Sequence, residues 1–350
     1  MTGFIELNSD QRREAINTQQ RYRQFQEAFS KHLACRGSMV WSETKGHQYL
    51  MRSGYDKQGR RRQTSLGVRS PETERIKSEF EKSRAAAAQR VNELAPIIRR
   101  QAAVNRALGL GRVPTIGAKI MRALDTNGLL GNGIRVLGAN ALYAYEAAAG
   151  VHIDGGLTTT EDIDLLLDSR RGVSFVATDE VDEASILRIL RRIDRSFERT
   201  RQDFRAANRD GYLVDLIKPL RDPPWRSDVA KVGDDPDDLS AVEITGLAWH
   251  ESAPAFEAIA FDDRGEPLRI VTTDPRVFAA HKLWLSKRPD REPVKRRRDG
   301  DQAAVVGRIV ADYLPHLPFD PDQLRMLPRT LVEEAKALFE PSGAESAFRA

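Results

Sequence analysis

Apolar residues recur every three to four positions over two long stretches near the start of the chain. This spacing predicts helices over residues 11–34 and 71–108. Between them, residues 39–68 alternate loosely and carry a turn at 57–59, which predicts two or three short antiparallel strands. The front of the chain is therefore expected to be a small sheet between two long helices.

Capping and helix-breaking residues set the limits of the second predicted helix. Ser70 is placed to be its N-cap and Pro71 its first residue. Pro96 is expected to kink or split the helix, because proline lacks the N–H of the helical ladder. The Gly-Leu-Gly sequence at 109–111 ends it. We therefore predict a first domain over residues 1–112.

The middle of the chain alternates short apolar strands with amphipathic helices, which predicts an α+β core over residues 113–239. The expected elements are a strand at 134–137, a helix at 140–149 closed by Gly150, a strand at 162–167, a helix at 186–197 and a strand at 211–217.

The remainder, residues 240–350, is expected to hold a β-hairpin and then helices. A turn at 262–265 lies between two strand-like pieces, and the expected helices cover 277–286, 302–313 and 331–339. The predicted fold class is α+β: a mixed sheet with flanking helices, a small basic N-terminal arm and a helical C-terminal region.

Composition narrows the setting. The chain has 350 residues, of which 40% are hydrophobic and 30% charged, as in a globular protein. No run of about 20 apolar residues is present, so no membrane span is expected. The start lacks the apolar segment of a secretory signal, and the single cysteine, Cys35, excludes an internal disulfide and a Cys-rich zinc site. These features favour the cytoplasm.

Charge is distributed unevenly. Residues 1–110 hold 21 Lys and Arg against 11 Asp and Glu, whereas the rest holds 34 against 40. Trp41 and two tyrosines are interleaved with cations that include Arg60, Arg61 and Arg62, a pattern typical of nucleic-acid binding. The pattern favours RNA over DNA as a partner. The alternatives are a solvated basic surface and a sheet that uses Trp41 as its core.

Three carboxylates carry the candidate chemistry. Asp162 and Asp164 are two residues apart on a predicted strand, so both side chains lie on one face. Asp215 interrupts the otherwise apolar sequence LVDLI, where a carboxylate is costly unless it is paired or binds a cation. The set suits Mg²⁺, and two such ions can support phosphoryl transfer. The alternative is structural: Asp162 caps a strand end and Asp164 pairs with an arginine.

A glycine turn precedes these carboxylates. Gly138 ends a predicted strand and Asn140 begins a helix, so a phosphate could approach the backbone and the N–H groups of the helix start.

Three segments resemble, in order, the motifs of the polymerase-beta-like nucleotidyltransferase superfamily: VLGANALYAYE at 136–146, TTEDIDLLLD at 159–168 and GYLVDLIKP at 211–219. The chain most resembles a bacterial family of that fold with a Gly-x-Asn-Ala-Leu-Tyr-Ala-Tyr-Glu motif, and more distantly the AbiEii-type toxin transferases. The resemblance implies that Asp162, Asp164 and Asp215 bind two Mg²⁺ ions, with Mn²⁺ as a substitute, and that Gly138–Asn140 binds an NTP. Ala139 replaces the Gly or Ser of relatives, so either the Asn140 side chain donates to the triphosphate instead or the backbone of the turn is sufficient.

A basic segment lies further on, at residues 287–298. It resembles the fourth motif of the toxin-type transferases, a helical Lys followed by a Lys/Arg-Asp pair. On that resemblance Lys282 and Asp299 are carried over as nucleotide-binding residues, with a basic loop between them. The alternative is a solvated loop, and we expect His281 to pack rather than to catalyse.

The sequence therefore predicts a metal-dependent nucleotidyltransferase that moves NMP from an NTP to an acceptor hydroxyl, possibly RNA such as a tRNA end. One alternative is a toxin-type or modifying transferase acting on a protein or a small molecule. Another is a non-catalytic nucleic-acid-binding module. The residues do not select the NTP, a protein partner or an oligomeric state.

Overall fold

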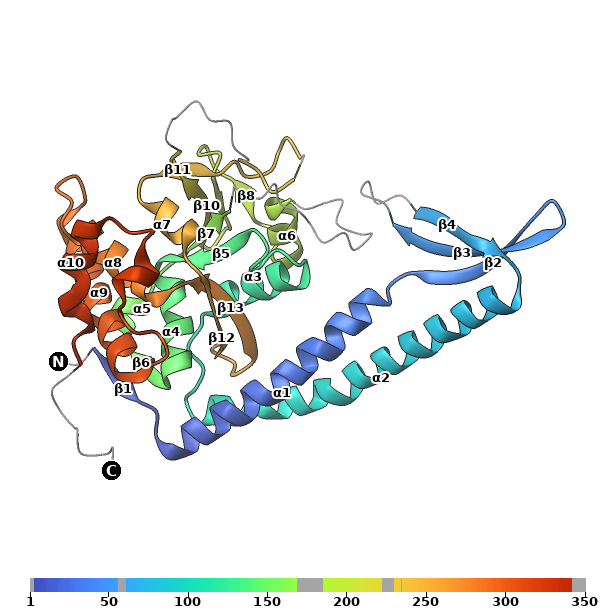
Figure 1. The fold of residues 1–350 in the computed structure, drawn as a ribbon, viewed down its shortest axis with the longest axis horizontal. Coiled ribbons are helices and arrows are strands. Elements are labelled where there is room, and N and C mark those ends of the chain that lie inside the picture. Colours follow the sequence, from blue (N-terminus) through green and yellow to red (C-terminus); the bar gives the residue numbers. More distant parts are fainter. Residues whose placement is uncertain (1–2, 56–60, 169–184, 222–229, 234, 342–350) are drawn as a thin grey trace.

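A computed structural model describes residues 3–55, 61–168, 185–221, 230–233 and 235–341. A long arm of two antiparallel helices extends from a body, and a small sheet lies at the far end of the arm (Figure 1). No helix within these described ranges is both long and apolar enough to cross a membrane. The fold class is α+β, as predicted.

The arm consists of two helices with three strands between them. Its elements are α1 (Ser9–Ala34), β2 (Ser38–Thr44), β3 (His47–Tyr55), β4 (Arg61–Val68) and α2 (Pro71–Ala107). The strands form an antiparallel sheet in the order β2-β3-β4. Ser70 caps α2 by accepting a hydrogen bond from the Thr73 N–H. Helix α2 runs on through Pro96, so of the predicted kink or split, the split is wrong; α1 packs along this continuous helix.

The base of the arm is fastened to the body by buried amide groups. The Nδ2 of Asn105 donates to the carbonyl of Gly265 at 2.9 Å, and its Oδ1 accepts from the Thr18 hydroxyl at 3.0 Å. One side chain thus joins α2 both to α1 and to the hairpin turn of the body. Gln19 adds a contact from α1 to the carbonyl of Ile259.

We expect Asn105→Ala to lower the free energy of unfolding by about 1–3 kcal/mol, because it leaves a buried carbonyl and a buried hydroxyl without their partner. Urea unfolding followed by tryptophan fluorescence measures the change. Asn132→Ala, at an exposed asparagine, is the control and is expected to have almost no effect. Equal losses in the two variants would contradict this fastening.

The body is built on a mixed sheet whose central strands are parallel. Its order is β5-β7-β10-β9-β8, and β11 also pairs with β10. Strand β7 runs parallel to β10 and antiparallel to β5, while β9 is antiparallel to β10. The strands are β5 (Ile134–Leu137), β7 (Asp162–Leu167), β8 (Glu198–Arg199), β9 (Arg205–Ala207), β10 (Leu213–Pro219) and β11 (Val242–Ile244).

One face of this sheet packs on the main core. Ile163, Leu165, Val214 and Leu216 point to that side and are buried. They are covered by α3 (Thr115–Thr126), by α6 (Ile186–Ile193) and by the hairpin of β12 (Ala255–Phe261) and β13 (Pro267–Thr273). The hairpin comes from beyond residue 240 in the chain, and it shares this core with the central segment.

The helical C-terminal region forms a second core with α4. Its elements are α8 (Pro275–Ser286), α9 (Pro293–Tyr313), η2 (Pro321–Leu324), α10 (Arg329–Ala335) and η3 (Lys336–Phe339). Helix α9 begins at Pro293, so the basic residues 295–298 are helical and the expected basic loop is limited to residues 287–292.

The first sequence motif forms the hub between the two cores. It comprises the 3-10 turn η1 (Gly138–Ala141) and α4 (Leu142–Ala149), which Gly150 closes with a left-handed φ of 69°. The Tyr145 hydroxyl donates to the Thr273 carbonyl at 2.9 Å. The next residue, Glu146, accepts from the backbone N–H of Ile153 at 2.9 Å and from Arg112. Burial raises the pKa of Glu146 to about 7.

Small elements complete the body around this hub. Strand β1 (Phe4–Glu6) pairs antiparallel with β6 (Val151–Ile153), which ties the start of the chain to the body. Short helices α5 (Gly155–Thr158) and α7 (Leu247–Ser252) flank the central sheet.

Candidate active site

The three predicted carboxylates lie on the same face of the sheet. Asp164 of β7 is directly opposite Asp215 of β10, and Asp162 is opposite Leu213, one pleat nearer the strand starts. Adjacent strands are about 4.8 Å apart, so these side chains are neighbours. The two carboxylates on one face of β7 and the single carboxylate within the apolar strand β10, both predicted from the sequence, thus form one cluster.

Apolar residues close the other end of the same face. Leu166 follows Asp164 by one pleat, Ile217 follows Asp215 in the same way, and both pack with Leu247 of α7. The carboxylates therefore occupy the starts of β7 and β10, where the face is left uncovered by α7. Each strand is acidic at its start and apolar further along, so the carboxylates and the apolar residues occupy different halves of this face.

Gly138 lies close to the carboxylate cluster. Strand β5 pairs with β7 so that Leu137 lies opposite Asp164, and the chain then turns at Gly138 with φ of 62°. A Cβ atom added at Gly138 would overlap Oδ2 of Asp164. The glycine is thus required both by its backbone conformation and by the carboxylate beside it.

Asp164 lies in an environment that disfavours its charged form. Burial raises its pKa to about 6, and the negative charges of Asp162 and Asp215 add to the rise. The positive charges of Lys282 and Arg205 oppose it. A half-buried carboxylate between two others is an environment that a divalent cation would stabilise.

The Asn140 side chain ties η1 to the start of β7. Its Nδ2 donates to the backbone carbonyl of Asp162 at 2.8 Å, and the residue is 1% exposed. Of the two predicted ways of holding a triphosphate here, the Asn140 side chain and the backbone, this burial favours the backbone. Gly138 and Ala139 are only half-buried, so their backbone remains the accessible part of the turn.

Asp215 is paired with an arginine that sequence reasoning missed. Arg205 lies opposite Asp215 on β9, its Nε donates to Oδ1 at 2.7 Å, and its Nη2 donates to Oδ2 at 2.6 Å. Within the described ranges, no three His, Cys, Asp or Glu side chains already converge as a metal-ligand set. The carboxylate oxygens suit Mg²⁺ by their chemistry, but Asp215 first has to exchange its arginine partner.

A second cation reaches the cluster from the helical region. Lys282 of α8 places Nζ 2.8 Å from Oδ1 of Asp299 on α9, and Arg291 pairs with the other oxygen of Asp299. Both residues carried over from the toxin-type motif thus come together. Asp299 is only 2% exposed, so it supports Lys282 rather than offering a surface to a nucleotide.

His281, next to this lysine, packs as expected. Its ring lies 4.4 Å from that of His250 and stacks on Trp284, and burial lowers its pKa.

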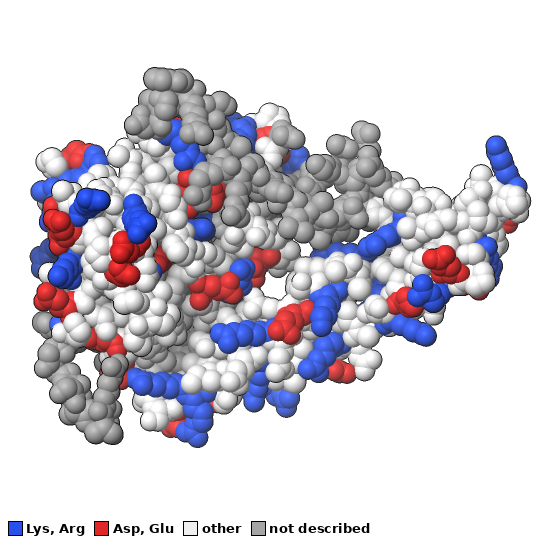
Figure 2. All heavy atoms as spheres, in the orientation of Figure 1, with Lys and Arg blue, Asp and Glu red and all other residues white. Residues whose placement is uncertain are grey.

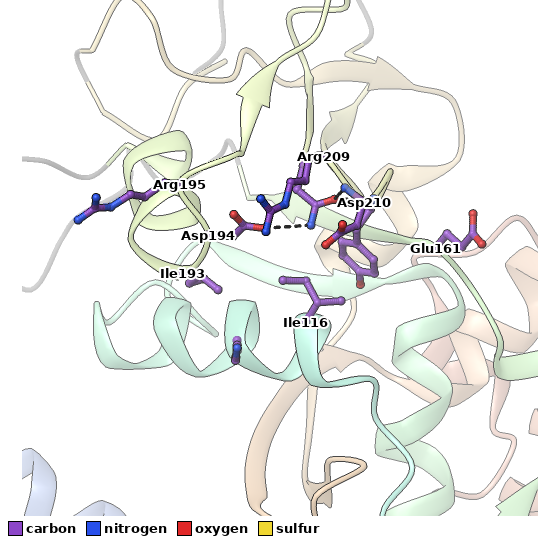
Figure 3. A pocket seen from close by; sticks show the side chains of 10 residues that line it. Ile116, Glu161, Ile193, Asp194, Arg195, Arg209 and Asp210 are labelled. Carbon is purple, nitrogen blue, oxygen red and sulfur yellow. Dashed lines mark hydrogen bonds between the residues drawn. The ribbon is translucent and has the colours of Figure 1, made fainter.

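A pocket of about 570 Å³ is lined by Glu161, the residue before Asp162, but by none of the three carboxylates (Figure 3). It lies between α3, the end of α6 and the β9–β10 turn, where Asn208 donates to Asp194 at 3.2 Å. Tyr212 forms the wall toward Asp162, and burial together with the negative charge of Asp162 raises the pKa of Tyr212. The lining holds three cationic and three acidic residues, so its charge does not select a ligand.

The residues predicted to bind nucleic acid lie at the far end of the arm. Trp41 is directly opposite Leu50, which is fully buried, and the guanidinium of Arg69 lies 5.2 Å from the Trp41 ring centre. Trp41 is half-buried on the tip sheet, with the Arg69 guanidinium over its ring. Arg60 and the side chains of Arg61 and Arg62 lie outside the described residues. Figure 2 shows Lys and Arg spread along both arm helices, with acidic residues among them.

A family model described as nucleotidyltransferase matches residues 116–327 of the chain. This match covers more than half of the sequence, including the Gly138 turn and the three carboxylates. The chain belongs to this nucleotidyltransferase family. No curated protein and no solved structure matches it significantly. The protein is therefore a nucleotidyltransferase enzyme, and the family match begins after the arm.

Proposed function

We propose that this nucleotidyltransferase is metal-dependent and transfers NMP from an NTP to an acceptor hydroxyl. Asp162, Asp164 and Asp215 would hold two Mg²⁺ ions, with Mn²⁺ able to substitute. The observation that carries the proposal is the cluster of these carboxylates on one sheet face beside the left-handed turn at Gly138. When bound, the ions would stabilise charge on the attacking and leaving oxygens of the phosphoryl group.

The chain's own groups supply position and charge. The accessible backbone of Gly138 and Ala139 would bind the triphosphate, since a helix start offers N–H donors. Lys282, held by Asp299, would add positive charge on the helical side of the site. An oxygen of Asp215 would accept the proton of the acceptor hydroxyl once Arg205 has released it.

Transfer of label is the direct test. The protein is incubated with each α-³²P-labelled NTP, Mg²⁺, total RNA and cell protein, with Asp162→Ala as control. We expect label in a fraction that ribonuclease digests and protease does not, and no label with Asp162→Ala. Label in protein or in small molecules would show that these, and not RNA, are the acceptors. Absence of label from all fractions would contradict the proposed transfer.

RNA is proposed as the acceptor because of the arm. The segment between the two arm helices, residues 35–70, holds eight Lys and Arg against two Asp and Glu, so the positive charge of the first 110 residues is concentrated there. A basic tip on a long, fastened arm is suited to a phosphate backbone extending away from the active site.

We expect the full-length protein to bind RNA with a steep salt dependence, a slope of log K against log salt of about −4 to −6. Replacing Arg60, Arg61 and Arg62 by Ala should flatten the slope by about 2, which corresponds to three lost phosphate contacts on a single strand. Fluorescence anisotropy at several salt concentrations measures the slope, with duplex DNA as the competing ligand.

The matched control removes the same charge elsewhere. Arg325, Arg329 and Lys336 are exposed on the C-terminal region, and their triple Ala variant should leave the slope unchanged. If both triple variants flatten the slope equally, binding follows net charge and the arm is not the RNA site.

A further inference from the structure

Arg205 holds Asp215 more tightly than a surface ion pair would. The two-pronged contact engages both oxygens of Asp215, and the side chains are 30% and 10% exposed. The ring of the preceding residue, Phe204, lies 5.4 Å from the guanidinium. Because β9 and β10 pair Arg205 directly with Asp215, the contact is built into the register of the sheet.

The same guanidinium faces the whole carboxylate cluster. The hydrogen bond that Arg205 donates to Asp215 raises the pKa of Arg205, and the charges of Asp215, Asp162 and Asp164 add to this effect. The other nearby cation, Lys282, is committed to Asp299. Among the described residues, Arg205 is therefore a cation that forms an ion pair with the carboxylate cluster itself.

A guanidinium fork and a divalent cation compete for the same carboxylate. The fork uses both oxygens in the carboxylate plane, and two positive groups bound to one carboxylate repel each other. Arginine cannot lose its charge, so the competition is relieved only if the guanidinium finds another anionic partner. The phosphate groups of a bound NTP are such a partner, because the same fork fits phosphate.

We propose that Arg205 is a positioning residue that occupies Asp215 until a nucleotide triphosphate arrives, and that the guanidinium then moves to a phosphate and frees Asp215 for the cation. Metal binding at Asp215 thereby depends on the nucleotide. The proposal rests on the metal-dependent transfer proposed above.

The test measures Mn²⁺ affinity by electron paramagnetic resonance, with and without a non-hydrolysable NTP. Without nucleotide, we expect Arg205→Gln to bind Mn²⁺ about tenfold more tightly than the wild type. The nucleotide should tighten Mn²⁺ binding less in this variant than in the wild type. A residue that merely supported the fold would give weaker, not tighter, binding when replaced.

Arg199→Gln is the matched control. It removes one positive charge from the neighbouring strand β8, where Arg199 is exposed and is paired at 3.8 Å with Asp203. Mn²⁺ affinity should hardly change in this control. Equal tightening in both variants would reduce the effect to general charge and overturn the proposal, as would unchanged or weaker binding in Arg205→Gln.

A measurement on the wild type keeps the proposal testable if Arg205→Gln fails to fold. The Nε–Hε NMR signal of Arg205, assigned with Arg205→Lys, should stay protected in the metal-free protein and shift when Mg²⁺ and the NTP analogue are added together. A signal that does not move overturns the proposal. Failure of the wild type to bind Mn²⁺ under any condition would instead contradict the proposed function.

Discussion

Asp164→Asn should abolish nucleotide transfer and, at the same time, stabilise the metal-free protein. Loss of one ligand charge from the cluster should reduce the transfer rate by at least about 10³-fold. The stability effect has the opposite direction because the wild-type carboxylate is ionised against burial and the charges of Asp162 and Asp215. Activity and stability therefore change in opposite senses at a single position.

The pH dependence follows from the direction of the pKa shift. The pKa of Asp164 is raised from 3.8 in the unfolded chain to about 6 in the fold, so the folded state favours the protonated form. Its contribution to stability is fully present below pH 3.8 and is lost as the pH rises to 6. The asparagine at this position is neutral at every pH. The variant should therefore be more stable than the wild type by about 1–2 kcal/mol at pH 8, and equally stable near pH 3.5.

Urea unfolding in EDTA at the two pH values measures this difference. Glu161→Gln, at the exposed carboxylate next to the cluster, is the control and should change neither activity nor stability appreciably. Retention of near wild-type transfer in Asp164→Asn would remove this residue from the catalytic site. A stabilisation that is equal at both pH values would contradict the electrostatic explanation.

Gly138→Ala should also inactivate the enzyme, by about 10²-fold or more, through displacement of the Asp164 carboxylate. The added methyl group overlaps Oδ2 of Asp164, so either the turn or the carboxylate has to move. The left-handed φ of 62° adds a backbone cost of about 1 kcal/mol for a residue with a Cβ. Turnover measurements and urea unfolding together report both effects.

Gly128→Ala separates the backbone cost from the contact with Asp164. Gly128 has φ of 68°, and a Cβ there would meet nothing within 4 Å. The backbone penalty is thus nearly the same, while the site is untouched. We expect Gly128→Ala to lose stability only and to keep full activity. If Gly138→Ala were as active as Gly128→Ala, the turn at Gly138 would not belong to the active site.

Much of the active site could be predicted from local sequence because its signals are short-range. Two carboxylates two residues apart on a strand share a face by the geometry of the strand alone, which placed Asp162 and Asp164 correctly together. A carboxylate within an apolar strand, as at Asp215, marks a site because burial of an unpaired charge is costly. Ser70 begins α2 and Gly150 ends α4 as predicted, since caps depend on neighbouring residues only.

The partners of these side chains were decided by the tertiary structure. Arg205 lies on a three-residue strand that has no periodic signal of its own, and only the register with β10 brings it to Asp215. In the same way, the amide of Asn140 is used by Asp162 across 22 residues of chain. Contacts between distant segments depend on packing and not on local propensity, so sequence patterns locate the carboxylates but not what they bind.

The long helices show the same division. The sequence by itself determined two helices around a small sheet, through helical spacing and a Ser-Pro start. It also contained a helix-breaking signal at Pro96, yet α2 continues through this residue and packs along α1. Similarly, the basic residues 295–298 look like a solvated loop in isolation. They become helical because α9 packs along α8, and that packing buries Asp299 and directs it to Lys282.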